Sequence, residues 1–140
     1  MKKLKSLVVL ALALTTFGLI GCSSNDATKE SSETRVVETA KGEVEIPANP
    51  KKIVDISGSS EELVLLGHNV VGTSNVPAYM KDKLGDAKVV GHSMMETADV
   101  EAILACEPDL IIMSTRQEQI YDELKEIAPT VMLEDQSNDW

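Results

Sequence analysis

The sequence predicts an α/β fold in which a parallel sheet is flanked by helices and preceded by a short β-hairpin. Short apolar runs rich in β-branched residues recur along the chain, at 53–56, 70–73, 88–90, 110–113 and 130–133. Segments with the apolar spacing of helices lie between several of these runs, and capping residues precede them. Strands that alternate with helices favour right-handed βαβ units, whose strands are parallel.

The hairpin is predicted from two alternating segments at the start of the folded part. Residues 34–39 and 43–46 alternate polar and aliphatic side chains, and a short segment ending in Gly42 separates them. Glycine tolerates the positive φ that a tight hairpin turn requires. Pro47 and Pro50 then end the second segment and lead into the first strand of the sheet.

The first two helices are predicted from their ends. Ser59 precedes Glu62 with capping-box spacing, and Gly67 fits the left-handed position just past the end of that helix. Asp99 is placed to cap a second helix, which ends at the Glu107-Pro108 step because proline cannot continue it. The segment 76–84 between them is expected to be irregular or a short helix.

A third helix is predicted after the most apolar strand, 110–113. Two pairs in this region have capping-box spacing, Ser114 with Gln117 and Thr115 with Glu118. Ile120, Leu124 and Ile127 follow at helical spacing, and a proline at 129 stops the helix.

The first 22 residues have the three parts of an export signal. Three lysines come first, an apolar run covers 7–20, and the run ends in Leu-Ile-Gly-Cys at Cys22. The apolar run is shorter than the ~20 residues that a membrane-spanning helix needs. The ending resembles the lipobox of bacterial lipoproteins, so we expect Cys22 to carry a lipid anchor; the alternative is an ordinary signal peptide with a chance cysteine.

This signal defines three regions. We expect residues 1–21 to be a lipoprotein signal peptide, 22–33 a flexible tether and 34–140 one folded domain. The tether is small, polar and charged, and such a segment buries too little apolar surface to fold. Two acyl chains, of the palmitate kind, on a lipidated cysteine anchor a protein stably. The expected location is therefore the extracytoplasmic face of the cell membrane.

Charge and motifs exclude several functions. The formal charge is −10, and the part that follows Cys22 carries −13, because the leader holds three lysines and no acid. Such a charge argues against nucleic acid as a partner. No nucleophile elbow, zinc-protease motif, P-loop or dinucleotide fingerprint is present, so an enzyme is not expected. Cys106 has no partner for a disulfide once Cys22 is lipidated, and it is expected to be a small buried hydrophobe.

Four segments carry a resemblance to a known family. They are Pro50–Val54, Ser57–Gly67, Asp99–Ile112 and Tyr121–Val131. In order and spacing, behind a lipobox, they resemble the N-terminal lobe of class III periplasmic binding proteins. These proteins serve ABC importers for ferric siderophores and cobalamin.

The resemblance implies a Rossmann-like lobe that is one of two. In the family a long helix joins the lobes, ligand lies in the cleft between them, and each lobe presents an acidic residue to the permease. Glu62 matches that position here; the alternative role of Glu62 is helix capping alone. The chain stops at Trp140, so we expect it to be a fragment without the C-terminal lobe.

The expected ligand is a ferric siderophore, with haem or cobalamin as the alternative within the family and a cell-surface enzyme or adhesion module outside it. Arg116 begins a helix after the most apolar strand and suits the oxygen-rich face of a ferric chelate, unless it is only a surface residue. Ser59, Ser60, Tyr79 and His92 come from other strand-end loops and are expected to line the same face. Tyr79 is as often a core lid, and His92 a solvated loop residue. Iron arrives inside the chelate, so neither a cofactor nor protein ligands to a metal are predicted.

Overall fold

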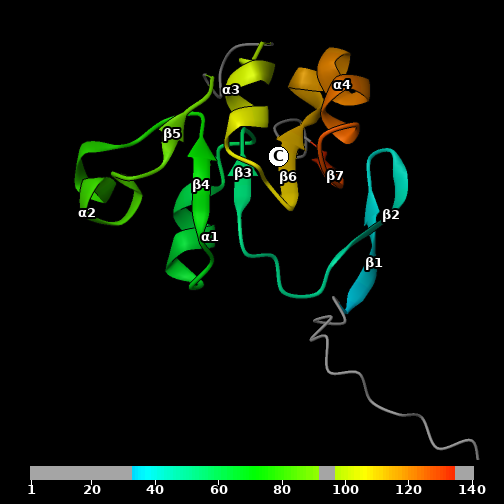
Figure 1. The fold of residues 1–140 in the computed structure, drawn as a ribbon, viewed down its shortest axis with the longest axis horizontal. Coiled ribbons are helices and arrows are strands. Elements are labelled where there is room, and N and C mark those ends of the chain that lie inside the picture. Colours follow the sequence, from blue (N-terminus) through cyan, green and yellow to red (C-terminus); the bar gives the residue numbers. More distant parts are fainter. Residues whose placement is uncertain (1–32, 92–96, 135–140) are drawn as a thin grey trace, which may run out of the picture.

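The structure of the chain, a computed structural model, describes residues 33–91 and 97–134. A two-stranded antiparallel hairpin precedes a five-stranded parallel sheet with the strand order β5-β4-β3-β6-β7 (Figure 1). The hairpin strands are β1 (Thr34–Thr39) and β2 (Gly42–Pro47), and the sheet strands are β3 (Ile53–Asp55), β4 (Val70–Thr73), β5 (Lys88–Val89), β6 (Leu110–Ser114) and β7 (Thr130–Leu133). The predicted fold class is confirmed.

Short helices connect the strands. They are α1 (Ser60–Leu65), α2 (Lys81–Leu84), α3 (Val100–Ala105) and α4 (Tyr121–Lys125), with the 3-10 helices η1 (Ala78–Met80) and η2 (Thr115–Ile120) directly before α2 and α4. Among the helices of residues 33–91 and 97–134, none combines the length and apolar character that a membrane span requires.

Neighbouring residues of each strand point to opposite sides of the sheet, and both sides are covered. Val54 and Ile111 lie in a buried cluster with Ile103 of α3 and Leu124 of α4. Ile53 and the flanking residues of β6 face the other way, toward the hairpin and α1, in a cluster that includes Ile46, Leu110, Val131 and the partly buried Leu63. The central strands are therefore buried from both sides, as their continuous apolar sequence predicts.

Local signals placed most element ends correctly. Gly42 and Gly67 adopt φ values of 92° and 89°, as expected for the hairpin turn and the end of α1. The Asp99 carboxylate accepts a hydrogen bond from the backbone N–H of Ala102 at 2.9 Å, so the predicted cap of α3 is confirmed. Strands β4 and β7 have the predicted bounds, and β3 and β5 are each one residue shorter.

The predicted third helix is divided in two. Helix η2 has non-helical backbone angles at Gln117 (φ −102°, ψ 18°), and α4 begins only at Tyr121. Leu124 is fully buried, and Ile120 and Ile127 pack against the same cluster, so the apolar spacing was interpreted correctly. The backbone departs from a helix where the Gln117 side chain turns inward to bind neighbouring strands.

The hairpin lies beside β7, at the opposite edge of the sheet from β5 (Figure 1). The Ala40 N–H donates to the carbonyl of Met132 in β7 at 2.9 Å. Lys41 pairs with Glu118, and its ammonium lies 5.7 Å from the centre of the Tyr121 ring. The turn thus covers part of an edge strand whose backbone groups would otherwise be open to pairing with another chain.

One residue offers a direct test of backbone strain. Glu107 follows α3 with φ 49°, in the left-handed region where glycine is the preferred residue. Replacing Glu107 with glycine is expected to raise the free energy of unfolding by about 0.5–1 kcal/mol, because the exposed ion pair with Lys52 that is lost contributes little. Glu107→Ala removes the same ion pair but keeps the side-chain clash, so urea denaturation should show no gain for that control.

Candidate ligand-binding site

The strand order creates a ligand-binding position at the carboxyl end of the sheet. From β3 the chain moves outward to β4 and β5, and then returns to the other side of β3 for β6 and β7. The order therefore reverses between β3 and β6, and ligands of open α/β sheets bind outside the carboxyl ends of the strands at such a point. The loops after β3, β4 and β6 form this edge.

A buried carboxylate organises the loop after β3. Asp55 is the last residue of the strand and is 0% exposed. Its Oδ1 accepts from the backbone N–H of Ser57 at 3.1 Å and from the Ser57 hydroxyl at 2.6 Å. Its Oδ2 accepts from the Ser60 hydroxyl at 2.6 Å. Three hydrogen bonds from the loop offset the cost of burying this carboxyl group and hold the loop in one conformation.

The network continues to the loop after β4. Ser60 Oγ lies 2.7 Å from Thr73 Oγ1, and the Ser74 N–H donates to the carbonyl of Asp55 at 3.1 Å. Ser60 donates its one hydroxyl proton to Asp55, so the Thr73 hydroxyl, with one proton of its own, has two acceptors in reach: Ser60 Oγ and the carbonyl of Asn75 at 3.0 Å. The loops after β3 and β4 are therefore joined through buried polar groups.

Ser59 does not have its predicted capping role. It stands at the N-cap of α1, but its side chain accepts no hydrogen bond from the helix, and its backbone angles (φ −96°, ψ 15°) differ from those of capping residues. Instead the Ser59 Oγ lies 3.1 Å from Ser57 Oγ, next to the Asp55 network. The capping-box prediction for Ser59 and Glu62 is therefore wrong, because the serine hydroxyls of this loop are organised around the buried carboxylate.

Gln117 joins the loop after β6 to the loop after β3. Its Oε1 accepts from the backbone N–H and the hydroxyl of Ser114 at 3.1 and 2.8 Å, which confirms the capping box predicted for this pair. Its Nε2 donates to the carbonyl of Ile56 at 3.3 Å. Gln117 is 1% exposed, so this bridge across the switch point is buried.

Asp55 and Gln117 were not identified as site residues from the sequence. Asp55 was assigned to a strand and Gln117 only to a cap, although both side chains are buried. The position of Asp55 inside the apolar run 53–56 is a signal that would have indicated it, because a buried polar side chain must find partners.

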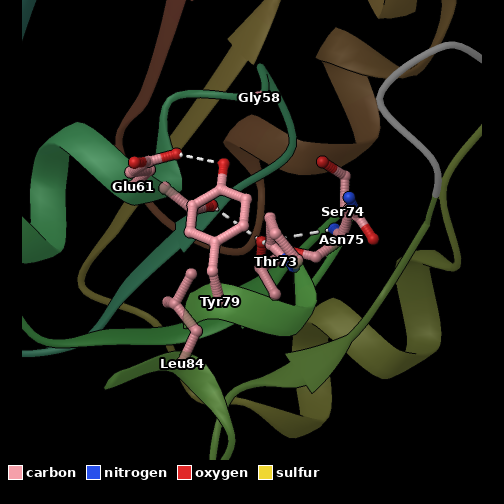
Figure 2. Close-up of a pocket in the computed structure, with 9 residues that line it drawn as sticks. Gly58, Glu61, Thr73, Ser74, Asn75, Tyr79 and Leu84 are labelled. Carbon is pink, nitrogen blue, oxygen red and sulfur yellow. Dashed lines mark hydrogen bonds between the residues drawn. The ribbon is translucent and has the colours of Figure 1, made fainter. Parts of the chain in front are cut away.

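A pocket opens between the loops after β3 and β4. Its volume is ≈ 170 Å³. The residues that line it are Gly58, Ser60, Glu61, Thr73, Ser74, Asn75, Pro77, Tyr79 and Leu84. Figure 2 shows Glu61 and Tyr79 on one side, and Ser74 and Asn75 on the other. The Tyr79 hydroxyl donates to Glu61 Oε2 at 2.8 Å, and this bond together with the charge of Glu61 raises the pKa of the phenol.

The structure brings some of the predicted ligand residues together. Ser60 and Tyr79 line the same pocket, and Tyr79 is exposed rather than a core lid. Ser59 is partly buried in the same loop but is not among the lining residues. Arg116 is exposed in η2, on the other side of β3, and its backbone N–H donates to Ser114 Oγ at 3.4 Å. His92 lies outside the described residues.

The remaining predicted positions have simpler outcomes. Glu62 is exposed in the first turn of α1, and Cys22 lies outside the described residues. Cys106 is partly rather than fully buried; it packs against the α3–α4 cluster, and burial raises the pKa of its thiol. Within residues 33–91 and 97–134, no group of three or more His, Cys, Asp or Glu side chains is placed to hold a metal ion.

Comparison with known protein families identifies the family of this chain. Residues 54–140 match the family described as "Periplasmic binding protein". The chain belongs to this periplasmic binding protein family. The resemblance carried by the four sequence segments is thereby confirmed.

Two curated relatives are similar in sequence to this chain. The "Probable siderophore-binding lipoprotein YfiY" of Bacillus subtilis (strain 168) is 38% identical over 99% of this chain and 46% of its own length. The "Iron(3+)-hydroxamate-binding protein YxeB" of the same organism is 39% identical over 79% of this chain and 33% of its own length. The chain thus spans less than half the length of these two relatives.

Solved structures of the family agree with the fold. Staphylococcus aureus SirA complexed with staphyloferrin B matches with a TM-score of 0.65 and 35% identity, over 71% of this chain and 36% of SirA. The iron uptake ABC transporter substrate-binding protein PiuA from Streptococcus pneumoniae matches with a TM-score of 0.62 and 40% identity, over 74% of this chain and 38% of PiuA. The names of YfiY, YxeB and PiuA describe them as binding proteins.

Proposed function

We propose that this chain is a ligand-capturing lobe of a lipid-anchored substrate-binding protein, which binds ferric siderophores and delivers them to an ABC permease for iron uptake. The observation that carries the proposal is the polar edge formed by the loops after β3, β4 and β6, on a chain of the periplasmic binding protein family. Two relatives whose names refer to siderophores or ferric hydroxamates support the choice of ligand.

The described residues suit the binding of a ligand without a chemical reaction. The Asp55 network and the Gln117 bridge hold three loops in fixed positions, so little ordering has to accompany ligand binding. The guanidinium of Arg116 offers a planar set of donors to the oxygen-rich surface of a chelate. Ferric iron is the cargo and arrives with its siderophore ligands already in place.

The proposed lipid anchor would determine where the protein is located. Lipid on Cys22 would hold the protein on the extracytoplasmic face of the cell membrane, with residues 22–33 as the tether. The name of the YfiY relative, a lipoprotein, supports this arrangement. A tethered protein stays near a membrane permease, where a high local concentration favours repeated delivery.

Calorimetric titration of the complete protein, including any residues that follow Trp140, tests the ligand. We expect the protein to bind at least one ferric hydroxamate or catecholate chelate. The same siderophore without its iron should not bind with comparable affinity. Binding of haem, seen as a new Soret band, or of cobalamin, without binding of any ferric chelate, would contradict the proposal.

Glu62 is the proposed contact with the permease. Its side chain is exposed and makes no hydrogen bond or ion pair among the described residues, so its replacement leaves the fold undisturbed. Glu62→Ala is expected to reduce uptake of the radiolabelled ferric ligand severalfold while the affinity for that ligand stays constant.

The matched control is Glu101→Ala, which removes the same charge from the first turn of α3. It should leave both uptake and affinity unchanged. Equal uptake by the Glu62→Ala variant and the wild-type protein would show that this acid makes no productive contact.

A further inference from the structure

The pocket beside Tyr79 is too small to hold a whole chelate. Sites that enclose complete small-molecule ligands have volumes of about 300–1,000 Å³, whereas this one measures ≈ 170 Å³. It holds several groups of the size of water. A pocket of this size suits one arm of a larger ligand whose centre lies elsewhere on the same edge of the sheet.

One wall of the pocket carries a negative charge. Of the described residues that line it, Glu61 is the one with a charged side chain. Its Oε2 accepts the hydrogen bond from Tyr79, which leaves Oε1 available to a ligand. A phenol is protonated at neutral pH, and Glu61 raises the pKa of Tyr79 further, so this tyrosine orients the carboxylate without cancelling its charge.

The opposite wall presents a serine hydroxyl without a protein partner. Ser74 is 2% exposed and lines the pocket, and its backbone N–H is bound to Asp55. Its side-chain hydroxyl makes no hydrogen bond to any described residue. No buried polar side-chain atom of the described residues lacks a partner, so this hydroxyl reaches the solvent of the pocket and is open to a donor or acceptor on a bound ligand.

The surroundings add further negative charge. The buried Asp55 carboxylate is bound to Ser60, which itself lines the pocket. No lysine or arginine is among the described lining residues. Attraction between a ligand cation and these two carboxyl groups is stronger in a half-enclosed site than in water.

We propose that this pocket is a subsite for a positively charged, hydrogen-bond-donating arm of the ligand, such as a primary ammonium, and that Glu61 selects for that arm. The inference rests on the proposed function, and it narrows the ligand to ferric chelates that carry such an arm. Arg116 then faces the anionic chelate while Glu61 binds its cationic end, so the two charges orient the ligand along the edge of the sheet.

A pair of probes tests this directly on the complete protein. One is a ferric linear trihydroxamate that ends in a primary ammonium, and the other is the same chelate with its amine acetylated. A second pair on a ferric tris-catecholate frame covers the other common donor type. The wild-type protein is expected to bind the ammonium form of one pair about tenfold more tightly, as one charge-assisted hydrogen bond predicts.

Glu61→Gln keeps the size of the side chain and an acceptor for Tyr79, but it removes the charge. This variant is expected to bind both forms with the lower affinity of the acetylated chelate, and its thermal unfolding should match the wild type. Glu62→Gln is the control, because it removes a neighbouring charge outside the pocket and should preserve the tenfold preference.

The outcomes separate the two proposals. Equal binding of the ammonium and acetylated forms by the wild-type protein overturns the subsite and leaves siderophore capture intact. A preference that Glu61→Gln retains also overturns the role of Glu61. Failure of every ferric chelate to bind overturns the proposed function and this inference with it.

Discussion

Replacing Asp55 with alanine is expected to lower the free energy of unfolding by about 3 kcal/mol and to abolish ligand binding. The carboxylate is fully buried and accepts three hydrogen bonds from Ser57 and Ser60. Its removal leaves the buried Ser60 hydroxyl and the partly buried N–H and hydroxyl of Ser57 without their acceptor, and a buried group that loses its partner costs about 1–3 kcal/mol. The loops after β3 and β4 would also lose the link between Ser60 and Thr73.

The matched variant is Asp55→Asn, which keeps the shape and one carbonyl acceptor. We expect it to lose about half as much stability, because the amide oxygen can still accept from the N–H and hydroxyl of Ser57, whereas the Ser60 hydroxyl must turn to accept from the amide nitrogen. Urea denaturation measures stability, and titration with the best ferric chelate measures binding. An alanine variant as stable as the wild type would show that the network does not hold the loops.

Replacing Cys22 with serine is expected to move the protein from the membrane fraction to the soluble extracytoplasmic fraction almost completely. Two acyl chains anchor a protein stably, and serine cannot form the thioether that carries them. Uptake of the ferric ligand should fall strongly as the local concentration near the permease is lost. The affinity of the purified protein should stay the same, because Cys22 precedes the predicted folded domain 34–140.

Labelling with a radioactive fatty acid, followed by fractionation, measures this change. Ser23→Ala is the control, since it alters the next residue and leaves the cysteine available. It should remain labelled and in the membrane fraction. A wild-type protein that is unlabelled and soluble would instead indicate an ordinary signal peptide with a chance cysteine at this position.

The elements of the fold were predictable because their signals are local. Alternation of apolar residues, the turn at Gly42, the cap at Asp99 and the capping box at Ser114 each involve residues close in the chain, and the structure confirms all four. The box at Ser59 has the same spacing but does not form. A pattern of four residues cannot reveal that a carboxylate from the preceding strand will compete for the serines.

The site was predictable only in outline. Two predicted residues from strand-end loops, Ser60 and Tyr79, line one pocket, and their role in ligand binding stays a prediction. The sequence did not indicate that Glu61 would bind Tyr79 or that Gln117 would bridge to Ile56, a residue 61 positions earlier. Such contacts depend on which loops the strand order brings together.

By itself, the sequence determined the alternation of strands and helices and the family to which the chain belongs, whereas the export signal stays a prediction. The tertiary structure alone decided the arrangement of the strands, the burial of Asp55, and the division of the edge into an acidic pocket and a separate arginine. The physical reason is the range of the interactions. Backbone propensity and capping act within a few residues, whereas buried polar groups take whichever partners the packed sheet places within hydrogen-bonding distance.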